Sequence, residues 1–546
     1  MFRLPAVFQL IISLFLHTHD NEDLLDQQFT AKSPWNSQNR APTVRQVDLV
    51  VQNEDISPDG FLRSGVLVGD SFPGPLIRGI KGDRFRINVT NLLTDNETME
   101  ASTSIHWHGI HQTHTNWEDG SAGVTQCPIP SKHSFVYEFD VHHQAGTFWY
   151  HSHYSTQYCD GLRGPFVVYD PDDPHRHLYD VDDENTIITL ADWYHLTSRL
   201  AMPPNSLPPL ADSILINGRG RSPEGPKTPL AVINVEYGKR YRLRLIQMAC
   251  DPNFNFTIDD HEMTIIEADS IATKPYTVDF LPIYAGQRYS LVLHANQPID
   301  NYWIRANPNT VRAESGFRNS INSAILRYTG APPMEPSPRR YPQARKPLVE
   351  TSLKSLMNTK PPGQPYPGGA DITINLQMAF DFETFLFTVN GAVFDAPKVP
   401  VILQILSGAE NADLLLPKGS VYVLPPNKVV ELSIPGTIED LGGPHPFHLH
   451  GHDFYVIKPA YTNEYNFEDP VRRDTLNTGF EDSNATVRFT TDNAGPWFLH
   501  CHVDWHLEMG LAVVFAEDTR GTKIQSAHVP DMWRELCMDY DAVKKS

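Results

Sequence analysis

Four His-x-His pairs in matching contexts are the strongest chemical signal in the chain. They are His106/His108, His151/His153, His448/His450 and His500/His502. In an extended strand, residues i and i+2 point to the same face, so each pair directs two imidazoles into one volume. Imidazole is a suitable ligand for copper, zinc, iron and nickel. The pairs therefore predict metal binding, although any single pair could equally be surface histidine.

The four pairs form two matched sets. Each set has His-x-His-Gly followed by Gly-x-aromatic-aromatic-x-His-x-His, in 106–109 with 146–153 and in 448–451 with 495–502. Eight histidines in two homologous half-sites predict one pseudo-symmetric centre that lies between two domains and holds more than one metal ion. His175-Arg176-His177 has no partner pair, and there the sequence favours surface histidines.

The second set carries three further candidate ligands. It adds His445, Cys501 and His506, whereas the first set has Thr103, Ser152 and Gln157 at the corresponding positions. Two imidazoles and one thiolate are the ligands of a blue-copper electron-transfer centre. Alternation along a strand places Cys501 on the face opposite His500 and His502, so its sulfur should bind a separate copper.

Short alternating runs must position these residues. Residues 84–89, 240–245 and 288–293 alternate with a period of two, and Gly, Pro, Asn and Asp separate such runs. This pattern predicts many half-buried strands packed in β-sandwiches, with long amphipathic helices nearly absent. Residues 82–87 and 238–243 look like copies of one run, and a fainter third copy lies at 427–432. We therefore expect three repeated domains, at 46–172, 173–345 and 346–546.

Composition limits the classes of function. The chain has 546 residues, of which 65 are acidic and 44 basic, and its formal charge of −21 disfavours nucleic acid and anionic membrane surfaces as partners. The apolar run at 4–16 is too short to span a membrane and has the length of a signal-peptide core, so residues 1–16 predict secretion. A polar N-terminal segment follows at 17–45. Glycosylation sequons at Asn88, Asn96, Asn255 and Asn484 agree with secretion.

Several motifs together resemble the three-domain multicopper oxidases, and most closely the fungal laccases of the basidiomycete type. They are HWHG (106–109), WYHSH (149–153), DGLRGPFVVYD (160–170), HPFHLHGH (445–452) and HCHVDWH (500–506). The resemblance covers about residues 48–541. It implies an all-β fold of three consecutive cupredoxin-like Greek-key β-sandwich domains, the middle one forming a wall of the substrate pocket.

The resemblance implies four copper ions per chain. His445, Cys501 and His506 would hold the type 1 copper, and His106 and His448 the type 2 copper. The type 3 pair would be held by His108, His151, His153, His450, His500 and His502. The axial position ten residues past Cys501 is Leu511, which cannot coordinate, and Met509 is interpreted as packing. Four cysteines other than Cys501 allow three disulfide pairings, of which the family pattern implies Cys127 to Cys537 and Cys159 to Cys250.

The implied activity is that of a secreted, monomeric laccase acting on small phenolic or aromatic donors and dioxygen. A donor loses one electron near His506, and four electrons reduce dioxygen to two waters. Asp251 matches a proton acceptor from the donor, although it also fits an ordinary turn. Asp119 resembles a carboxylate that relays protons near the type 2 copper, or is a solvated turn acid. Asp504 is a candidate partner for a ligand imidazole.

Two alternatives compete with the laccase prediction. A ferroxidase, or another multicopper oxidase with a non-phenolic donor, needs carboxylates beside the type 1 histidines, and Asp251 is the sequence's one candidate. A secreted copper-binding protein without turnover is the more remote alternative. His111, His114 and the pair Asn309-Thr310 depart from the family pattern. The first two predict a different local loop without extra copper binding, and the last leaves the donor preference open.

Overall fold

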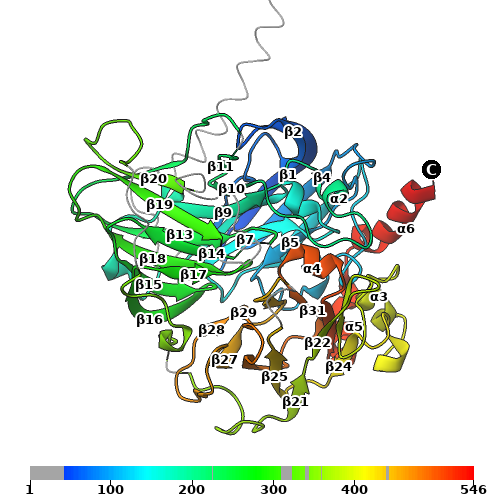
Figure 1. Ribbon diagram of the computed structural model, residues 1–546. Coiled ribbons are helices and arrows are strands. Elements are labelled where there is room, and N and C mark those ends of the chain that lie inside the picture. Colours follow the sequence, from blue (N-terminus) through cyan, green and yellow to red (C-terminus); the bar gives the residue numbers. More distant parts are fainter. Residues whose placement is uncertain are drawn as a thin grey trace, which may run out of the picture.

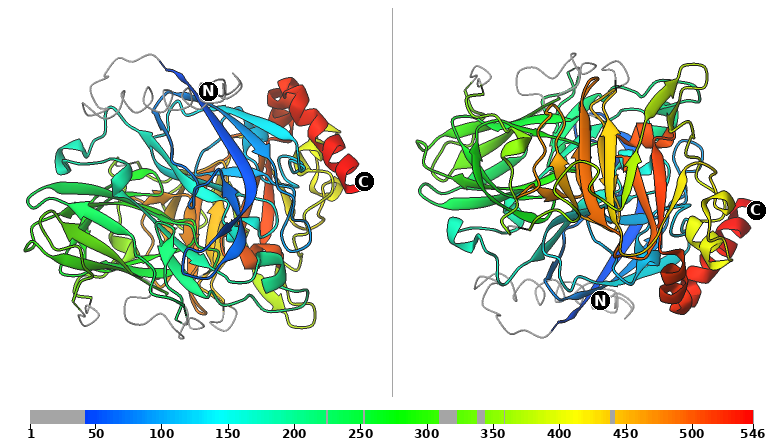
Figure 2. Two further views of the ribbon diagram at one scale, coloured as in Figure 1. Left: turned by 90° about the horizontal axis from the view of Figure 1, so that it is seen from above. Right: turned by 90° about the horizontal axis from the view of Figure 1, so that it is seen from below.

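The computed structural model describes residues 42–545 except 224, 252, 309–322, 338–343, 358 and 438–441. The predicted signal peptide, most of the polar segment 17–45 and the pair Asn309-Thr310 therefore lie outside the described residues. The described chain forms three β-sandwiches placed around a common centre (Figures 1 and 2). The prediction of three cupredoxin-like domains is confirmed, while their boundaries stay predictions.

The first sandwich has two four-stranded sheets, with the orders β2-β1-β4-β6 and β3-β8-β7-β5. Its strands are β1 (Val44–Ile56), β2 (Arg63–Val68), β3 (Ile77–Ile80), β4 (Arg84–Asn91), β5 (Ile105–His108), β6 (Ser134–Asp140), β7 (Gly146–Ser152) and β8 (Arg163–Tyr169).

The middle sandwich has a seven-stranded sheet, β11-β10-β9-β13-β18-β15-β16, and a five-stranded sheet, β12-β20-β19-β14-β17. Its strands are β9 (Ile187–Trp193), β10 (Ser213–Ile216), β11 (Arg219–Gly220), β12 (Val232–Val235), β13 (Arg240–Gln247), β14 (Phe254–Ile258), β15 (Met263–Ala268), β16 (Ile271–Val278), β17 (Leu281–Ile283), β18 (Arg288–His294), β19 (Asn301–Pro308) and β20 (Ser323–Tyr328). A short helix, α2 (Ser198–Ala201), follows β9.

The last sandwich has two five-stranded sheets, β21-β25-β30-β27-β28 and β24-β32-β31-β26-β29, and a hairpin of β22 and β23. Its strands are β21 (Ile372–Asn375), β22 (Met378–Asp381), β23 (Leu386–Val389), β24 (Val421–Leu424), β25 (Val429–Pro435), β26 (Pro446–Leu449), β27 (Phe454–Lys458), β28 (Arg472–Arg473), β29 (Thr475–Asn477), β30 (Asn484–Thr490), β31 (Gly495–Cys501) and β32 (Ala512–Glu517). Its helices are α3 (Val401–Leu406), α4 (Asp504–Glu508), α5 (Thr519–Gln525) and α6 (Asp531–Lys545).

The three similar sequence runs occupy equivalent places in the three sandwiches. They contribute to β4, β13 and β25, each of which pairs in parallel with the first strand of its sandwich, β1, β9 or β21. Each also pairs antiparallel with a second strand, β6, β18 or β30. The repeat predicted from sequence is therefore a repeat of topology.

Two packing features fix the sandwiches relative to one another. One hydrophobic core continues from the middle sandwich into the last, so that Leu243, Ile304, Cys501 and Trp505 belong to a single cluster. Helix α6, at 15 residues the longest described helix, buries Trp533 and Leu536 against the core of the first sandwich. No helix among the described residues is long and apolar enough to cross a membrane.

Candidate metal centre

One candidate site lies within the last sandwich and joins one thiol to two imidazoles. His445 directly precedes β26, Cys501 ends β31 and His506 lies on α4. The Cys501 Sγ atom lies 3.5 Å from His445 Nδ1 and 3.7 Å from His506 Nδ1, and the two nitrogens are 3.1 Å apart. All three side chains are buried, and Cys501 is the free cysteine. The predicted His-Cys-His set is therefore assembled.

A second candidate site uses the four paired strands that carry the His-x-His motifs. β5 pairs with β7 so that His106 lies opposite His151, and β26 pairs with β31 so that His448 lies opposite His500. Since the side chains of i and i+2 share a face, each strand pair presents its imidazoles together. The same register thus recurs in the first and last sandwiches.

These two half-sites face each other across the domain interface. The ring of His106 stacks on that of His450, with centroids 3.8 Å apart, and His108 stacks on His448 at 3.7 Å. His153 Nε2 lies 3.4 Å from His500 Nε2, and His108 Nδ1 lies 3.2 Å from His502 Nε2. Eight buried imidazoles from two domains enclose one volume, and Cys501 lies between His500 and His502 on β31.

Comparison with known proteins now identifies the family. Three family models described as multicopper oxidase match residues 50–173, 184–331 and 395–521. The chain is 57% identical to Laccase-2 of Pleurotus ostreatus over 508 residues, which span 91% of this chain and 92% of that protein. The chain belongs to the laccases of the multicopper oxidase family.

Solved structures extend the likeness over all three laccase domains. The laccase from Botrytis aclada has a TM-score of 0.78 and 30% identity, and covers 94% of this chain and 95% of its own. Fet3p, a multicopper oxidase that functions in iron import, has a TM-score of 0.79 and 29% identity, and covers 91% and 95%.

The side chains of this laccase fit copper ions. Several buried ring nitrogens point into the shared volume without a hydrogen-bond partner, namely His106 Nε2, His151 Nε2, His448 Nε2 and His502 Nδ1. The opposite nitrogens of three of these rings lie against backbone carbonyl oxygens, those of Asp119, Ser152 and Asp474, at 2.8 to 3.0 Å. Such contacts fix the tautomer and leave the inward lone pair for a metal.

Burial keeps most imidazoles of the two candidate sites neutral, the form in which histidine binds a metal ion. It lowers the pKa of His445 to about 4 and, together with neighbouring imidazoles, that of His500 to about 3. Burial and neighbouring imidazoles also lower the pKa well below its usual value for His108, His151, His153, His450 and His502. Burial, assisted by the Asp251 and Asp504 carboxylates, raises the pKa of the Cys501 thiol. A nearby cation is therefore needed to form the thiolate.

Apolar residues pack around the thiol site, and Thr437 adds a polar contact, with its Oγ1 atom 2.9 Å from His445 Nε2. Leu511 is fully buried, donates its amide to the His506 carbonyl oxygen at 3.0 Å and accepts a hydrogen bond from the Cys501 amide at 3.1 Å. Met509 packs in the hydrophobic core, as expected. The Phe387 ring contacts both imidazoles, with centroids 5.6 Å from His445 and 5.0 Å from His506.

Asp119 is not a solvated turn acid, because it is completely buried between the two half-sites. Its Oδ2 atom lies 2.8 Å from His450 Nδ1 and accepts a hydrogen bond from Ser121 Oγ at 2.6 Å. Its backbone oxygen lies 2.8 Å from His106 Nδ1. One residue therefore contacts imidazoles from both domains.

The other two predicted carboxylates lie near the thiol site. Asp251 is half-buried, and its amide donates to Asp192 Oδ2 at 3.1 Å. Asp504 is buried, and its Oδ2 atom lies 3.3 Å from the sulfur of Cys159. Asp504 thus lies against a disulfide, whereas the sequence suggested a ligand imidazole as its partner.

Both disulfides implied by the resemblance are present. Cys127 is bonded to Cys537, which ties α6 to the first sandwich, and Cys159 is bonded to Cys250.

The histidines outside the two sites also have defined environments. His175 is buried with Nε2 2.9 Å from the Thr273 carbonyl oxygen, so the expectation of a surface residue was wrong there, although His177 is exposed. His111 Nε2 lies 3.2 Å from Asp453 Oδ2, and His114 is exposed.

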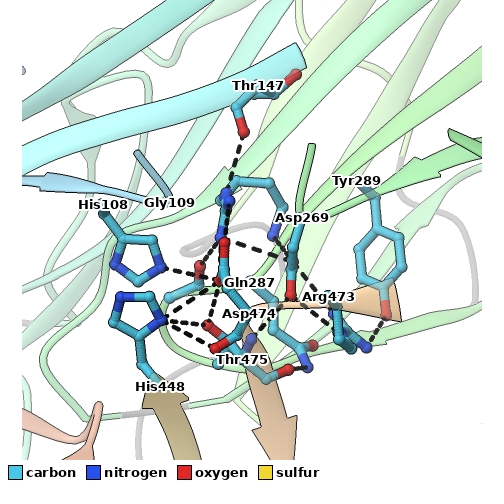
Figure 3. Close-up of polar contacts among 12 residues, drawn as sticks. His108, Gly109, Thr147, Asp269, Gln287, Tyr289, His448, Arg473, Asp474 and Thr475 are labelled. Carbon is cyan, nitrogen blue, oxygen red and sulfur yellow. Dashed lines mark hydrogen bonds and ion pairs between the residues drawn. The ribbon is translucent and has the colours of Figure 1, made fainter. Parts of the chain in front are cut away.

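Asp474, which was not identified from the sequence, lies beside two imidazoles of the site formed by the eight histidines (Figure 3). Its Oδ1 atom is 3.4 Å from His108 Nε2 and 3.4 Å from His448 Nδ1. The available signal was a run of three charged residues, 472–474, between buried Val471 and Leu476. Three consecutive charges inside a buried strand pattern require partners.

Proposed function

We propose that this laccase oxidises phenolic or aromatic donors one electron at a time at the His445–Cys501–His506 site and reduces dioxygen to water at the eight-histidine site. The observation that carries the proposal is the position of Cys501. Its side chain belongs to the first site, while its chain neighbours His500 and His502 belong to the second. A covalent route of a few bonds therefore joins the two sites.

The residue roles that we infer are those implied by the family resemblance, and the two clusters are compatible with them. His445, Cys501 and His506 would hold the type 1 copper, with Leu511, which cannot coordinate, next to them. His106 and His448 would hold the type 2 copper, and the type 3 pair would be held by His108, His151, His153, His450, His500 and His502. Copper bound at these residues would supply one-electron redox chemistry, by which four donor oxidations balance the reduction of one dioxygen to two waters.

The protein's own groups hold and move the protons. Asp251 accepts the phenolic proton, because oxidation makes a phenol far more acidic and this carboxylate is near enough to the thiol site to raise the pKa of Cys501. Asp119 relays protons for water formation through its Oδ1 atom, which is buried without a hydrogen-bond partner, while its Oδ2 atom contacts His450 Nδ1 at 2.8 Å. Burial excludes bulk water from both imidazole sites, so proton delivery depends on such fixed groups.

The protein is proposed to act outside the cell as a monomer. The apolar run at 4–16, the even set of disulfide cysteines and the resemblance to fungal laccases support secretion. Asn96 is an exposed sequon and the best placed of the four for a glycan, because Asn255 is only partly exposed and because Asn88 and Asn484 engage their side chains in hydrogen bonds.

Oxygen uptake with two donors tests the function. A methoxyphenol should support uptake with four donor molecules oxidised for each dioxygen consumed, and with no hydrogen peroxide. Iron(II) should be a poorer donor, since of the two carboxylates assigned near the thiol site Asp504 is buried, and Asp251 alone is partly exposed. Uptake confined to iron(II) would replace the laccase assignment with a ferroxidase.

A further inference from the structure

The middle domain supplies none of the proposed copper ligands, yet it packs directly against them. Gly286, in the turn between β17 and β18, has a φ of +86°. A Cβ atom at this position would lie 2.9 Å from His502 Cδ2 and 3.1 Å from His108 Cε1. Glycine is therefore required for this turn to touch imidazoles of both flanking domains.

Arg288, two residues later, reaches across the interface to Asp474 of the last domain. Its Nη1 atom donates to Asp474 Oδ1 and its Nη2 atom to Oδ2, each at 2.7 Å. Two further donors are satisfied by carbonyl oxygens, Nε by that of Thr147 at 3.1 Å and Nη1 by that of Gly286 at 3.0 Å. Both charged side chains are buried, with exposures of 0% and 1%. A bidentate, fully buried guanidinium allows the carboxylate a single orientation.

A reciprocal contact runs in the opposite direction between the same two domains (Figure 3). Arg473 of the last domain donates to Asp269 Oδ2 of the middle domain at 2.9 Å. Asp269 Oδ1 accepts a hydrogen bond from the Arg288 amide at 2.8 Å, and its Oδ2 atom accepts one from the Thr475 amide at 3.2 Å. Each domain thus contributes one arginine and one aspartate, and the segment 473–475 is held from both sides.

Asp474, held in this way, contacts one imidazole of the first domain, His108, and one of the last domain, His448. Its carboxylate faces His108 Nε2, while His108 Nδ1 faces His502 at 3.2 Å. Its backbone oxygen lies 3.0 Å from His448 Nδ1, while His448 Nε2 points inward without a partner. Both carboxylate oxygens of Asp474 accept hydrogen bonds from the Arg288 guanidinium, at 2.7 Å each. The carboxylate therefore stays an acceptor.

A glycine of the first domain leaves space for the ion pair between Arg288 and Asp474. Gly109, the last residue of the HWHG motif, has a φ of +90°. A Cβ atom there would lie 2.6 Å from Arg288 Nη2 and 3.0 Å from Asp474 Oδ2. The glycine of the motif thus leaves room for an ion pair contributed by the other two domains.

We propose that Arg288 is a positioning residue of the three-copper site, through which the middle domain fixes the orientation and tautomer of His108 and His448 by way of Asp474. The inference rests on the proposed function, because it concerns the ligands assigned there. Partners of ligand histidines typically change metal affinity about 10- to 100-fold when they are removed. The middle domain is then part of the oxygen-reducing centre as well as a wall of the donor pocket.

The test compares two lysine substitutions in matched ion pairs. Arg288→Lys keeps the charge but loses the bidentate contact. Arg244→Lys is the control, because Arg244 is equally buried, makes two 2.7 Å contacts with Asp182 and also touches Thr147, yet contacts none of the proposed ligands. Copper per chain, the blue absorption band and the type 2 electron paramagnetic resonance spectrum are recorded for each variant during titration with a copper chelator.

We expect Arg288→Lys to release copper from the three-copper site at about 10- to 100-fold lower chelator concentration and to alter the type 2 spectrum, with the blue band unchanged. Arg244→Lys should match the wild type. An Arg288→Lys spectrum and copper retention identical to the wild type would overturn the proposal, and so would equal losses in both variants. If Arg288→Lys does not fold, the isosteric Asp474→Asn must show the same selective loss. Failure of the proposed function can be told apart from failure of this inference by the wild-type copper count, because a wild type without four coppers per chain would contradict the proposed function itself.

Discussion

Copper loading of the metal-free protein should release few protons, because burial already keeps the imidazoles neutral. The pKa is lowered for seven of the ten proposed ligand histidines, to about 4 for His445, about 3 for His500, and well below the usual value for the rest. At pH 5.5 a histidine with an ordinary pKa of about 6.5 is about nine-tenths protonated. Seven such residues would together release about six protons on binding metal.

The structure predicts that these seven histidines release almost no protons when copper binds, because they are already neutral. The Cys501 thiol, whose pKa is raised by burial, contributes one proton, and the three other ligand histidines contribute at most three. Loading at pH 5.5 should therefore release about four protons or fewer. Solvent-like imidazoles would give about seven or more.

Calorimetric titration of the metal-free protein with copper(I) under argon, in two buffers of different ionisation enthalpy, counts these protons. Copper(I) is used because it does not acidify bound water. At pH 8.5 both descriptions predict little beyond the thiol proton, so that titration is the internal control. A release of seven or more protons at pH 5.5 would refute the idea that the site is prepared as neutral ligands by burial.

Three further predictions concern single properties of the protein. Metal-free protein should lose stability as the pH falls from 7.5 to 5.5, by up to about 1.4 kcal/mol for each histidine whose pKa is lowered by burial. The reason is that the unfolded chain binds more protons than the folded chain in this range. Denaturant unfolding at both pH values, with the disulfides intact, measures the free energy of unfolding, and equal values at the two pH values would contradict the prediction. Asp119→Asn should slow reoxidation of the reduced enzyme by dioxygen by about 10²-fold or more while donor oxidation is preserved, as stopped-flow measurements of the two half-reactions would show; equal slowing of both half-reactions would argue against the relay. Leu511→Met should lower the potential of the blue site by supplying a weak axial ligand, measurable by redox titration, and an unchanged potential would mean that position 511 is not axial.

Local patterns predicted those parts of the site that depend on one strand at a time. Period-two alternation placed both imidazoles of each pair on one face, and it placed Cys501 on the other, as the Sγ distances to His445 and His506 show. The similar runs at 82–87, 238–243 and 427–432 indicated the repeated sandwich, because each forms part of the same central strand. Asp119 was recognised only through the family resemblance, since a local pattern cannot show that a turn will be buried.

Contacts that join distant segments could not be predicted in this way. Asp474 and Arg288 are 186 residues apart, and their 2.7 Å contacts arise only when the middle and last domains dock. The same holds for His175, which looked like surface histidine until its hydrogen bond to the Thr273 carbonyl oxygen was seen, 98 residues away. The sequence pattern also predicted no element for His506, which lies on α4, whose turn brings it back to Cys501. Sequence spacing shows which residues can meet within an element, whereas tertiary packing decides which residues meet between domains.

The docking of the first and last domains around a common metal cluster is best tested by counting electrons. The purified, copper-loaded protein is titrated anaerobically with a one-electron donor while the blue band is followed, and dioxygen is then added. We predict that the protein accepts four electrons per chain and that the blue band returns with water as the product. Acceptance of a single electron, or the return of colour with stoichiometric hydrogen peroxide, would show that the eight imidazoles do not work as one centre joined to Cys501.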